Sequence, residues 1–186
     1  MKNFLSFILF VALFATQLQA QTTLNTAVDF TATDCHGQQV NLFEVLDGGQ
    51  YVLIDFFFTT CGPCQASVPK IKAAYEHFGC NDHEVFFMEI SPTDNNAQCL
   101  AWVNNFGIEY PTIGKDGGGN TICAQYGIPQ YPTVILIKPD RSIVIKDLWP
   151  IPSAQTIIDA LTPHGIQQHE CGNTEPECLP ATNVNA

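Results

Sequence analysis

Basic residues are scarce in this chain. Its 186 residues include 7 Lys and Arg against 18 Asp and Glu, which gives a formal net charge of −11. Binding to a phosphate backbone needs a basic patch, so this balance argues against a nucleic-acid partner. No block of five like charges occurs. The acidity is therefore interpreted as a solubilising surface.

The chain also lacks an apolar run long enough to span a bilayer, which takes roughly 20 residues. An apolar stretch from Phe4 to Ala15 follows a charged start at Lys2 and precedes the small residue Ala20. This pattern predicts a secretory signal peptide over residues 1–20, with an uncleaved membrane anchor as the alternative. No cysteine follows directly to carry a lipid. We therefore expect an exported protein, periplasmic or secreted, with no membrane span after signal cleavage.

Internal repeats and low-complexity runs are absent too. After the leader, the chain is long enough for one domain with a proper core. We expect that domain over residues 21–165. Residues 166–186 are polar and without periodicity, and we expect them to form a loop-like or disordered cysteine-containing tail.

The pattern of apolar residues predicts alternating strands and helices. Strands are expected at 51–58, 84–90 and 110–113, and a hairpin over 133–149. Helices are expected at 62–78, from a cap within 91–94 to residue 106, near 123–126 and at 153–161. A short helical turn is expected at 40–46 and a loop at 116–120. Alternation of this kind builds an α/β fold with a mainly parallel sheet between helices. The closing hairpin adds antiparallel strands, which makes the sheet mixed.

Eight cysteines are present, and one pair has a spacing of its own: Cys61-Gly62-Pro63-Cys64. A four-ligand zinc site would need a second C-x-x-C, which is absent. A haem attachment site would need histidine after the second cysteine, where Gln65 stands. A structural disulfide closed over two residues remains an alternative to a redox dithiol. No metal or other cofactor is expected, because the dithiol itself would be the redox centre.

The predicted helix start gives the two cysteines different roles. The first lies where unpaired backbone N–H groups converge, and these groups and the helix dipole stabilise a thiolate. A thiolate attacks disulfides, and a second thiol three residues on can attack the mixed disulfide and release the product. Cys61 is thus the candidate nucleophile and Cys64 the candidate resolving thiol.

Asp55 is a carboxylate inside the apolar run YVLIDFFF, six residues before Cys61. If the strand is buried, desolvation raises the pKa of this carboxyl. The group could then exchange protons near neutral pH. The alternatives are an exposed Asp in a misplaced strand and a core polar group with its hydrogen bonds satisfied.

Four features of the sequence resemble thioredoxin. The CGPC motif follows an apolar strand, Asp55 lies six residues before Cys61, and Pro69 lies five residues after Cys64. A distant Tyr-Pro-Thr segment leads into another strand. The longer stretch at about 91–120 and the leader are more similar to the exported TlpA-like branch of the redoxin (AhpC–TSA-type) sequences. The resemblance covers about residues 28–162. It implies a thioredoxin-like fold with an inserted segment between the second core strand and the cis-proline loop.

The resemblance also implies site roles. Pro132 would be cis and pack opposite Cys61, and the backbone of Tyr131 would hydrogen-bond an extended substrate peptide. Gly62, Pro63 and Thr133 complete the expected substrate-binding set. Asp55 would lie behind Cys64 and take its proton. Two departures stand out: the large Tyr131, and Thr60 where the family has tryptophan before the first cysteine.

We therefore expect an exported thiol–disulfide oxidoreductase acting on protein thiols and disulfides, with an unidentified electron donor or acceptor. The direction of exchange is not readable from the sequence. One alternative is a binding or adaptor module that uses the Tyr131–Pro132 surface. A thiol peroxidase is another, although peroxiredoxins resemble one another in a threonine three residues before their reactive cysteine, where this chain has Phe58.

The remaining six cysteines allow many pairings. Proximity in sequence suggests a local bridge between Cys171 and Cys178, and a second bridge from Cys80 to Cys99 is considered. Cys123, near the Tyr-Pro segment, could serve as a second redox relay. Structural roles are the default expectation.

Overall fold

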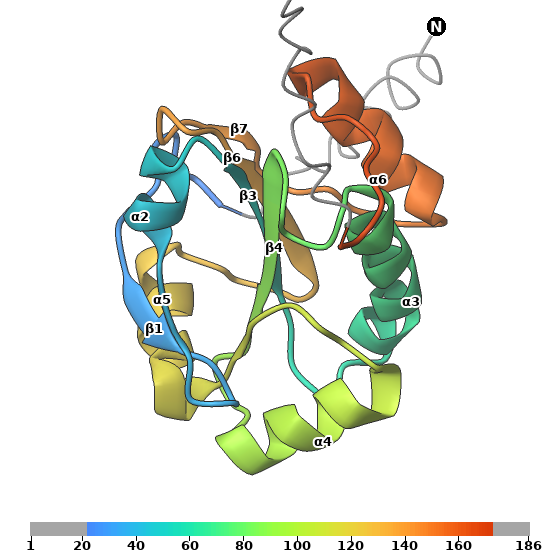
Figure 1. Cartoon of the computed structure of the whole chain (residues 1–186). Coiled ribbons are helices and arrows are strands. Elements are labelled where there is room, and N and C mark those ends of the chain that lie inside the picture. The colour runs from blue at the N-terminus through green and yellow to red at the C-terminus, as the bar shows by residue number, and fades with distance from the viewer. Residues whose placement is uncertain (1–21, 173–186) are drawn as a thin grey trace, which may run out of the picture.

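The computed structural model of the chain describes residues 22–172, and Figure 1 shows their arrangement. The predicted signal peptide and Cys178 lie outside the described residues. Five strands form one sheet in the order β5-β4-β3-β6-β7. Their bounds are Tyr51–Phe56 (β3), Val85–Ile90 (β4), Thr112–Ile113 (β5), Thr133–Ile137 (β6) and Ile143–Ile145 (β7).

The sheet is mixed, as predicted. β3 pairs in parallel with β4, and β4 with β5, whereas β6 is antiparallel to both β3 and β7. The three central strands β3, β4 and β6 have the sequences YVLIDF, VFFMEI and TVILI. Such nearly continuous apolar runs belong to strands that are covered on both faces.

Helices cover both faces of this sheet (Figure 1). On one side lie α3 (Gly62–His77), α4 (Asn96–Phe106) and α6 (Ala154–Leu161); on the other lie α2 (Leu42–Asp47) and α5 (Gly119–Gln125). Each side has its own apolar core. The first core contains Leu53, Val68 and Leu161, and the second contains Ile54, Leu46 and Ile122. No helix of residues 22–172 is long and apolar enough to cross a membrane.

The N-terminal segment contains a two-stranded antiparallel sheet, β1 (Thr31–Thr33) with β2 (Gln39–Asn41), that the sequence did not predict. Its strands are three residues long and mostly polar, so they lack the apolar periodicity on which such a prediction depends. The expected short helical turn at 40–46 is present as α2.

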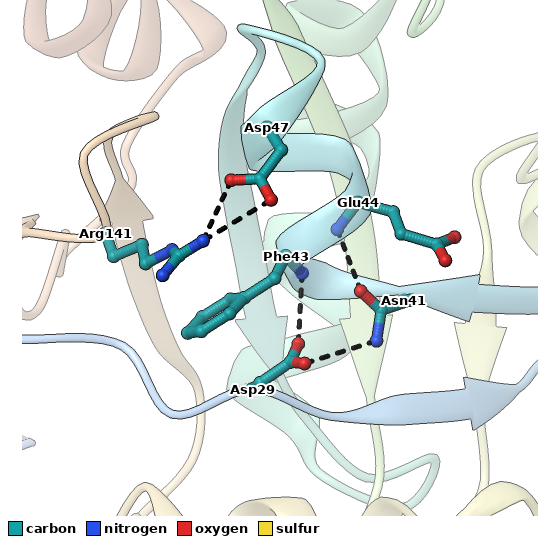
Figure 2. Close-up of polar contacts among 6 residues, drawn as sticks. All are labelled: Asp29, Asn41, Phe43, Glu44, Asp47 and Arg141. Carbon is teal, nitrogen blue, oxygen red and sulfur yellow. Dashed lines mark hydrogen bonds and ion pairs between the residues drawn. The ribbon is translucent and has the colours of Figure 1, made fainter.

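Polar contacts fasten this segment to α2 and to the β6–β7 hairpin, as Figure 2 shows. Asn41 caps α2, and its side chain accepts the N–H of Glu44 at 2.8 Å. Asp29 accepts the N–H of Phe43 at 3.0 Å. Arg141, in the hairpin turn, pairs with Asp47 at 3.0 Å and lies over the ring of Phe43. The hairpin and α2 are thereby joined at the edge of the sheet.

The segment between β4 and β6 differs from the prediction in two places. The cap of α4 is Asn95, which forms a capping box with Gln98, and not a residue within 91–94. The expected loop at 116–120 contains the 3₁₀ turn η1 (Lys115–Gly117) and the start of α5. Ser91 and Asp94 are instead buried and bonded to each other, which frees Asn95 to begin the helix.

The described part of the tail, residues 166–172, contains no helix or strand and packs against the domain. Cys80 forms a disulfide with Cys171, so both suggested pairings, Cys80–Cys99 and Cys171–Cys178, are wrong. Ile166 is buried, and the N–H of His169 donates to the carbonyl of His77 at 3.0 Å. The tail therefore follows η2 (Thr162–His164) back to the C-terminal end of α3.

Candidate active site

Cys61 lies at the N-cap of α3, directly after the loop that leaves β3. Its backbone is extended, and its sulfur accepts the N–H of Cys64 at 3.1 Å. Pro63 occupies the first turn, where its missing N–H costs no hydrogen bond. The N–H groups of a helix start have no intrahelical partner, so they are available to stabilise negative charge on this sulfur.

Cys61 and Cys64 are joined by a disulfide. Cys61 keeps 4% of its surface exposed, whereas Cys64 is fully buried at 0%. Gly62 and Pro63, between them, are exposed. Of the two cysteines, Cys61 is therefore the one with any surface open to a partner molecule at this end of α3.

The loop before Cys61 is held by the segment between β4 and α4. Asp94 is buried and accepts both the N–H of Thr59 at 2.8 Å and its hydroxyl at 2.6 Å. Ser91 donates a further bond to the same carboxylate at 2.6 Å. Gln65, on the first turn of α3, donates to the carbonyl of Thr59 at 2.8 Å. Sequence reasoning missed Asp94 because it took this residue for a helix cap.

Across from the start of α3 lies the loop that enters β6. The Tyr131–Pro132 peptide bond is cis, as the resemblance implied. Tyr131, Pro132, Pro63 and Gln130 line a shallow pocket of about 140 Å³ together with Trp149. The ring of Tyr131 meets the ring of Phe58 edge-on at 5.5 Å. The structure thus brings the CGPC turn and the Tyr-Pro loop together around one hollow.

Two residues change the predicted substrate-binding set. Thr133 is fully buried, and its hydroxyl donates to the carbonyl of Gln130 at 2.9 Å, so its side chain does not line the pocket. Trp149 does line it, with 41% of its surface exposed. Nothing in the sequence pattern singled out Trp149, since it appeared only as the end of a strand. An exposed tryptophan that shares a pocket with Pro63 of the CGPC turn is the signal that the structure adds.

Asp55 is buried within β3, with 1% of its surface exposed. Side chains alternate along a strand, so Asp55 shares a face with Leu53 and Phe57. Those two residues belong to the same core as Cys64. Neither carboxyl oxygen of Asp55 has a hydrogen-bond partner, and burial raises its pKa from 3.8 to about 7. Glu89, on β4, is a further buried carboxyl that the sequence did not single out.

The other described cysteines that are not in disulfides are Cys35, Cys99 and Cys123, and all three are buried. Burial raises the pKa of Cys35 to about 11 and those of Cys99 and Cys123 to about 12. At neutral pH they are therefore protonated thiols, which are poor nucleophiles. Within residues 22–172, no group of three His, Cys, Asp or Glu side chains is placed to hold a metal ion.

Fold and site define a thioredoxin-like protein with a C-x-x-C dithiol at a helix start. Residues 24–146 match the model of the AhpC/TSA family. The chain belongs to this family.

Relatives and solved structures agree with this classification. The chain is 30% identical over 118 residues to the thiol-disulfide oxidoreductase ResA of Halalkalibacterium halodurans, covering 63% of this chain and 64% of that protein. It is 29% identical over 119 residues to ResA of Bacillus anthracis, and the match covers 63% of this chain and 65% of that protein. The chain thus spans less than two thirds of the length of these curated relatives.

Among solved structures, the thioredoxin domain of a thiol-disulfide oxidoreductase from Bacteroides vulgatus superposes with a TM-score of 0.62 at 25% identity, covering 77% of this chain and 98% of that one. A thiol:disulfide interchange protein from a Bacteroides species gives a TM-score of 0.63 at 24% identity, and the match covers 78% of this chain and 91% of that one. The predicted resemblance to redoxin-type thiol–disulfide oxidoreductases is confirmed.

Proposed function

We propose that this protein is an exported thiol–disulfide oxidoreductase that exchanges disulfides with protein substrates through Cys61 and Cys64. The observation that carries the proposal is the asymmetry of the pair. Cys61 keeps 4% of its surface exposed and its sulfur accepts a backbone N–H, whereas Cys64 has no exposed surface and is bonded to it. An accessible, stabilised thiolate suits attack, and a buried partner suits intramolecular release.

In the reducing direction, the reduced protein starts as a Cys61 thiolate and a Cys64 thiol. Cys61 attacks one sulfur of the substrate disulfide, forms a mixed disulfide and releases the other substrate sulfur as a thiolate. Cys64 then loses its proton to Asp55 and attacks the Cys61 sulfur. The Cys61–Cys64 bond forms, and the second substrate sulfur departs with the electron pair and is protonated. The reverse sequence oxidises a substrate dithiol.

The hollow between the CGPC turn and the Tyr131–Pro132 loop supports binding of an extended peptide. Backbone groups of Tyr131 could pair with a substrate strand, as in strand addition. Trp149 and Pro63 offer apolar surface for a side chain next to the substrate cysteine. The thiolate and the peptide would then be held side by side.

Export is part of the proposal, with residues 1–20 as the leader, 21–165 as the domain and 166–186 as the tail. The Cys80–Cys171 disulfide supports it, because structural disulfides persist in oxidising compartments. The proposed partners are protein thiols and disulfides, together with an electron donor or acceptor of unidentified nature. The proposed chemistry needs no cofactor, since the dithiol carries the electrons.

The direct test is exchange by the purified mature protein. We expect it to catalyse either insulin reduction with a dithiol donor or the rescue of scrambled ribonuclease, and Cys61→Ser to be inactive in both. A redox titration of the pair then gives the direction: a potential near −270 mV would indicate a reductase and one near −120 mV an oxidase. No exchange by the wild type in either assay would overturn the enzyme proposal and favour a binding module.

Trp149→Ala is expected to raise KM for insulin about tenfold. Removing a large apolar contact at the substrate surface costs on the order of 1–2 kcal/mol of binding. A small aromatic disulfide does not need the pocket, so its reduction should change less. Val144→Ala is the matched control, because Val144 is similarly exposed at 39% and does not line the pocket. Equal effects on both substrates would show that Trp149 does not contribute to binding of the protein substrate.

A further inference from the structure

A second hollow adjoins the CGPC turn, between the first turn of α3 and the helix α4 (Figure 1). Its volume is about 480 Å³, which is larger than the 140 Å³ of the hollow beside Trp149, and the two share no lining residue. We call it the α3–α4 groove. The residues that form it include Thr59, Gln65, Gln98, Trp102, Asn105 and Phe106. The proposed reaction makes no use of this groove.

Two aromatic rings give the groove a fixed apolar floor. Trp102 is 4% exposed, its indole N–H donates to Glu89 at 3.0 Å, and its ring stacks on Phe57 at 4.9 Å. The ring of the half-buried Phe106 lies 4.5 Å from that of Trp102. A surface that is already held in place loses little conformational entropy when a side chain packs on it.

Two glutamine side chains at the groove are each held at one end and free at the other. Gln65 donates its Nε2–H to the carbonyl of Thr59 at 2.8 Å, which leaves its Oε1 as an acceptor. Gln98 accepts the N–H of Asn95 on its Oε1 at 2.9 Å, which leaves its Nε2–H as a donor. Within residues 22–172, neither free end makes a hydrogen bond. One acceptor and one donor match the N–H and C=O groups of an extended peptide.

Charge is missing from the groove, although the chain carries a net charge of −11. Among the described residues, no Asp, Glu, Lys, Arg or His lines it, and none lines the hollow beside Trp149. A hollow at the start of β4, by contrast, is lined by Asp82, His83 and Glu84. Burying a charged side chain without a partner is costly. The groove therefore favours an uncharged occupant.

The groove also lies within reach of a chain that is bonded to Cys61. Gln65 follows Cys61 by four residues along the start of α3, and one helical turn rises about 5.4 Å. An extended chain covers about 3.3 Å per residue. Residues only a few positions from a substrate cysteine at Cys61 therefore reach the groove.

We propose that the α3–α4 groove is a substrate subsite that takes an uncharged, extended segment of the polypeptide next to the reacting cysteine. This inference rests on the proposed function and names its substrate class. A backbone N–H of the segment donates to Oε1 of Gln65, and a carbonyl accepts the Nε2–H of Gln98. An apolar side chain of the segment packs on Trp102 and Phe106.

Binding can be measured without any exchange chemistry. The probe is a peptide of neutral residues with one leucine and with serine in place of cysteine, added to the ¹⁵N-labelled oxidised protein. We expect the side-chain amide signals of Gln65 and Gln98 to shift and saturate. Those of Gln50 should stay, because both its bonds are made at the far hollow, to the carbonyls of Asn81 and His83.

Two outcomes of this titration would overturn the subsite, whether or not the protein is an oxidoreductase. One is the absence of any shift at Gln65 and Gln98. The other is a shift of the same signals with protein concentration alone, which would make the occupant a second copy of the chain.

Exchange kinetics test whether the groove serves the reaction. The substrate is a neutral peptide whose cysteine is disulfide-bonded to a small aromatic thiol. The Cys61 thiolate bonds to the peptide sulfur, and the aromatic thiolate leaves with the electron pair. Gln98→Glu keeps the acceptor of the capping box but replaces the donor with a carboxylate. We expect the rate with the peptide, relative to that with a symmetrical aromatic disulfide, to fall about tenfold.

Asn104→Asp is the matched control, because it adds the same charge at an exposed position of α4 that does not line the groove. Its rate ratio should equal that of the wild type. Equal falls in both variants, or no fall in Gln98→Glu, would refute the subsite while leaving the oxidoreductase intact. A wild type that reacts with neither disulfide would refute the proposed function instead, and the amide titration would still decide the groove.

A comparison of two peptides tests the substrate class. The acidic protein attracts a lysine-flanked peptide from a distance, and about 1 M salt screens this attraction to a range of about 3 Å. At that salt concentration, we expect the neutral peptide to react about tenfold faster than the lysine-flanked one. An equal or faster reaction of the lysine-flanked peptide would contradict an uncharged substrate segment.

Discussion

Cys64→Ser is expected to stop the reaction at the mixed disulfide. Cys61 remains at the helix start and attacks the substrate, but the serine hydroxyl cannot break the new disulfide. Turnover should therefore fall to the uncatalysed background while a covalent complex accumulates. Mass spectrometry under non-reducing conditions should show one substrate chain per protein, and dithiothreitol should release it.

Two control variants test whether the covalent complex depends on Cys61 alone. Cys61→Ser should form no complex, because Cys64 is fully buried and cannot reach a substrate disulfide. Cys99→Ser changes a buried thiol that is in no disulfide and should behave as the wild type does. If Cys61→Ser captured substrate and Cys64→Ser did not, the proposed roles of the two cysteines would be reversed.

Features that depend on short stretches of chain could be predicted. The apolar runs of β3, β4 and β6 indicated buried strands, and Pro63 placed the start of α3, because strand burial and helix initiation are set by neighbouring residues. The Cys61–Cys64 pair could be recognised from its spacing and from the helix predicted to follow it. The fold class was therefore accessible from the sequence, and so was the choice of Cys61 and Cys64 as the candidate dithiol.

Features that depend on distant contacts could not be predicted. Cys80 and Cys171 are separated by 91 positions, and local proximity favoured the wrong partners. Glu89 is one acid in an apolar strand until the β3–β4 register places it beside Asp55. Trp149 becomes part of the site only because its loop reaches the start of α3. In each case the missing information was the packing of two elements.

Asp55→Asn is expected to slow the resolving step by about 100-fold at pH 8, at the lower end of the range for general-base catalysis. Only the ionised carboxylate accepts the Cys64 proton. With a pKa of about 7, the wild-type rate should rise with pH through neutrality and then level off, whereas the variant should lack this rise. Rapid-quench sampling of the mixed disulfide measures both steps. Equal slowing of formation and resolution would contradict the proposed role.

The same substitution should stabilise the fold, and the sign follows from linkage. Because the pKa of Asp55 rises from 3.8 to about 7 on folding, the unfolded chain loses this proton first. Wild-type stability should then fall as pH rises from about 4 to 7, by on the order of 4 kcal/mol. Asn cannot ionise, so urea unfolding should show Asp55→Asn to be more stable above pH 7 and nearly unchanged at pH 4. Loss of stability at pH 8 would mean that the ionised carboxylate is well solvated in the folded protein. A variant that is slower and yet more stable would instead show that the buried charge is retained for catalysis at the expense of stability.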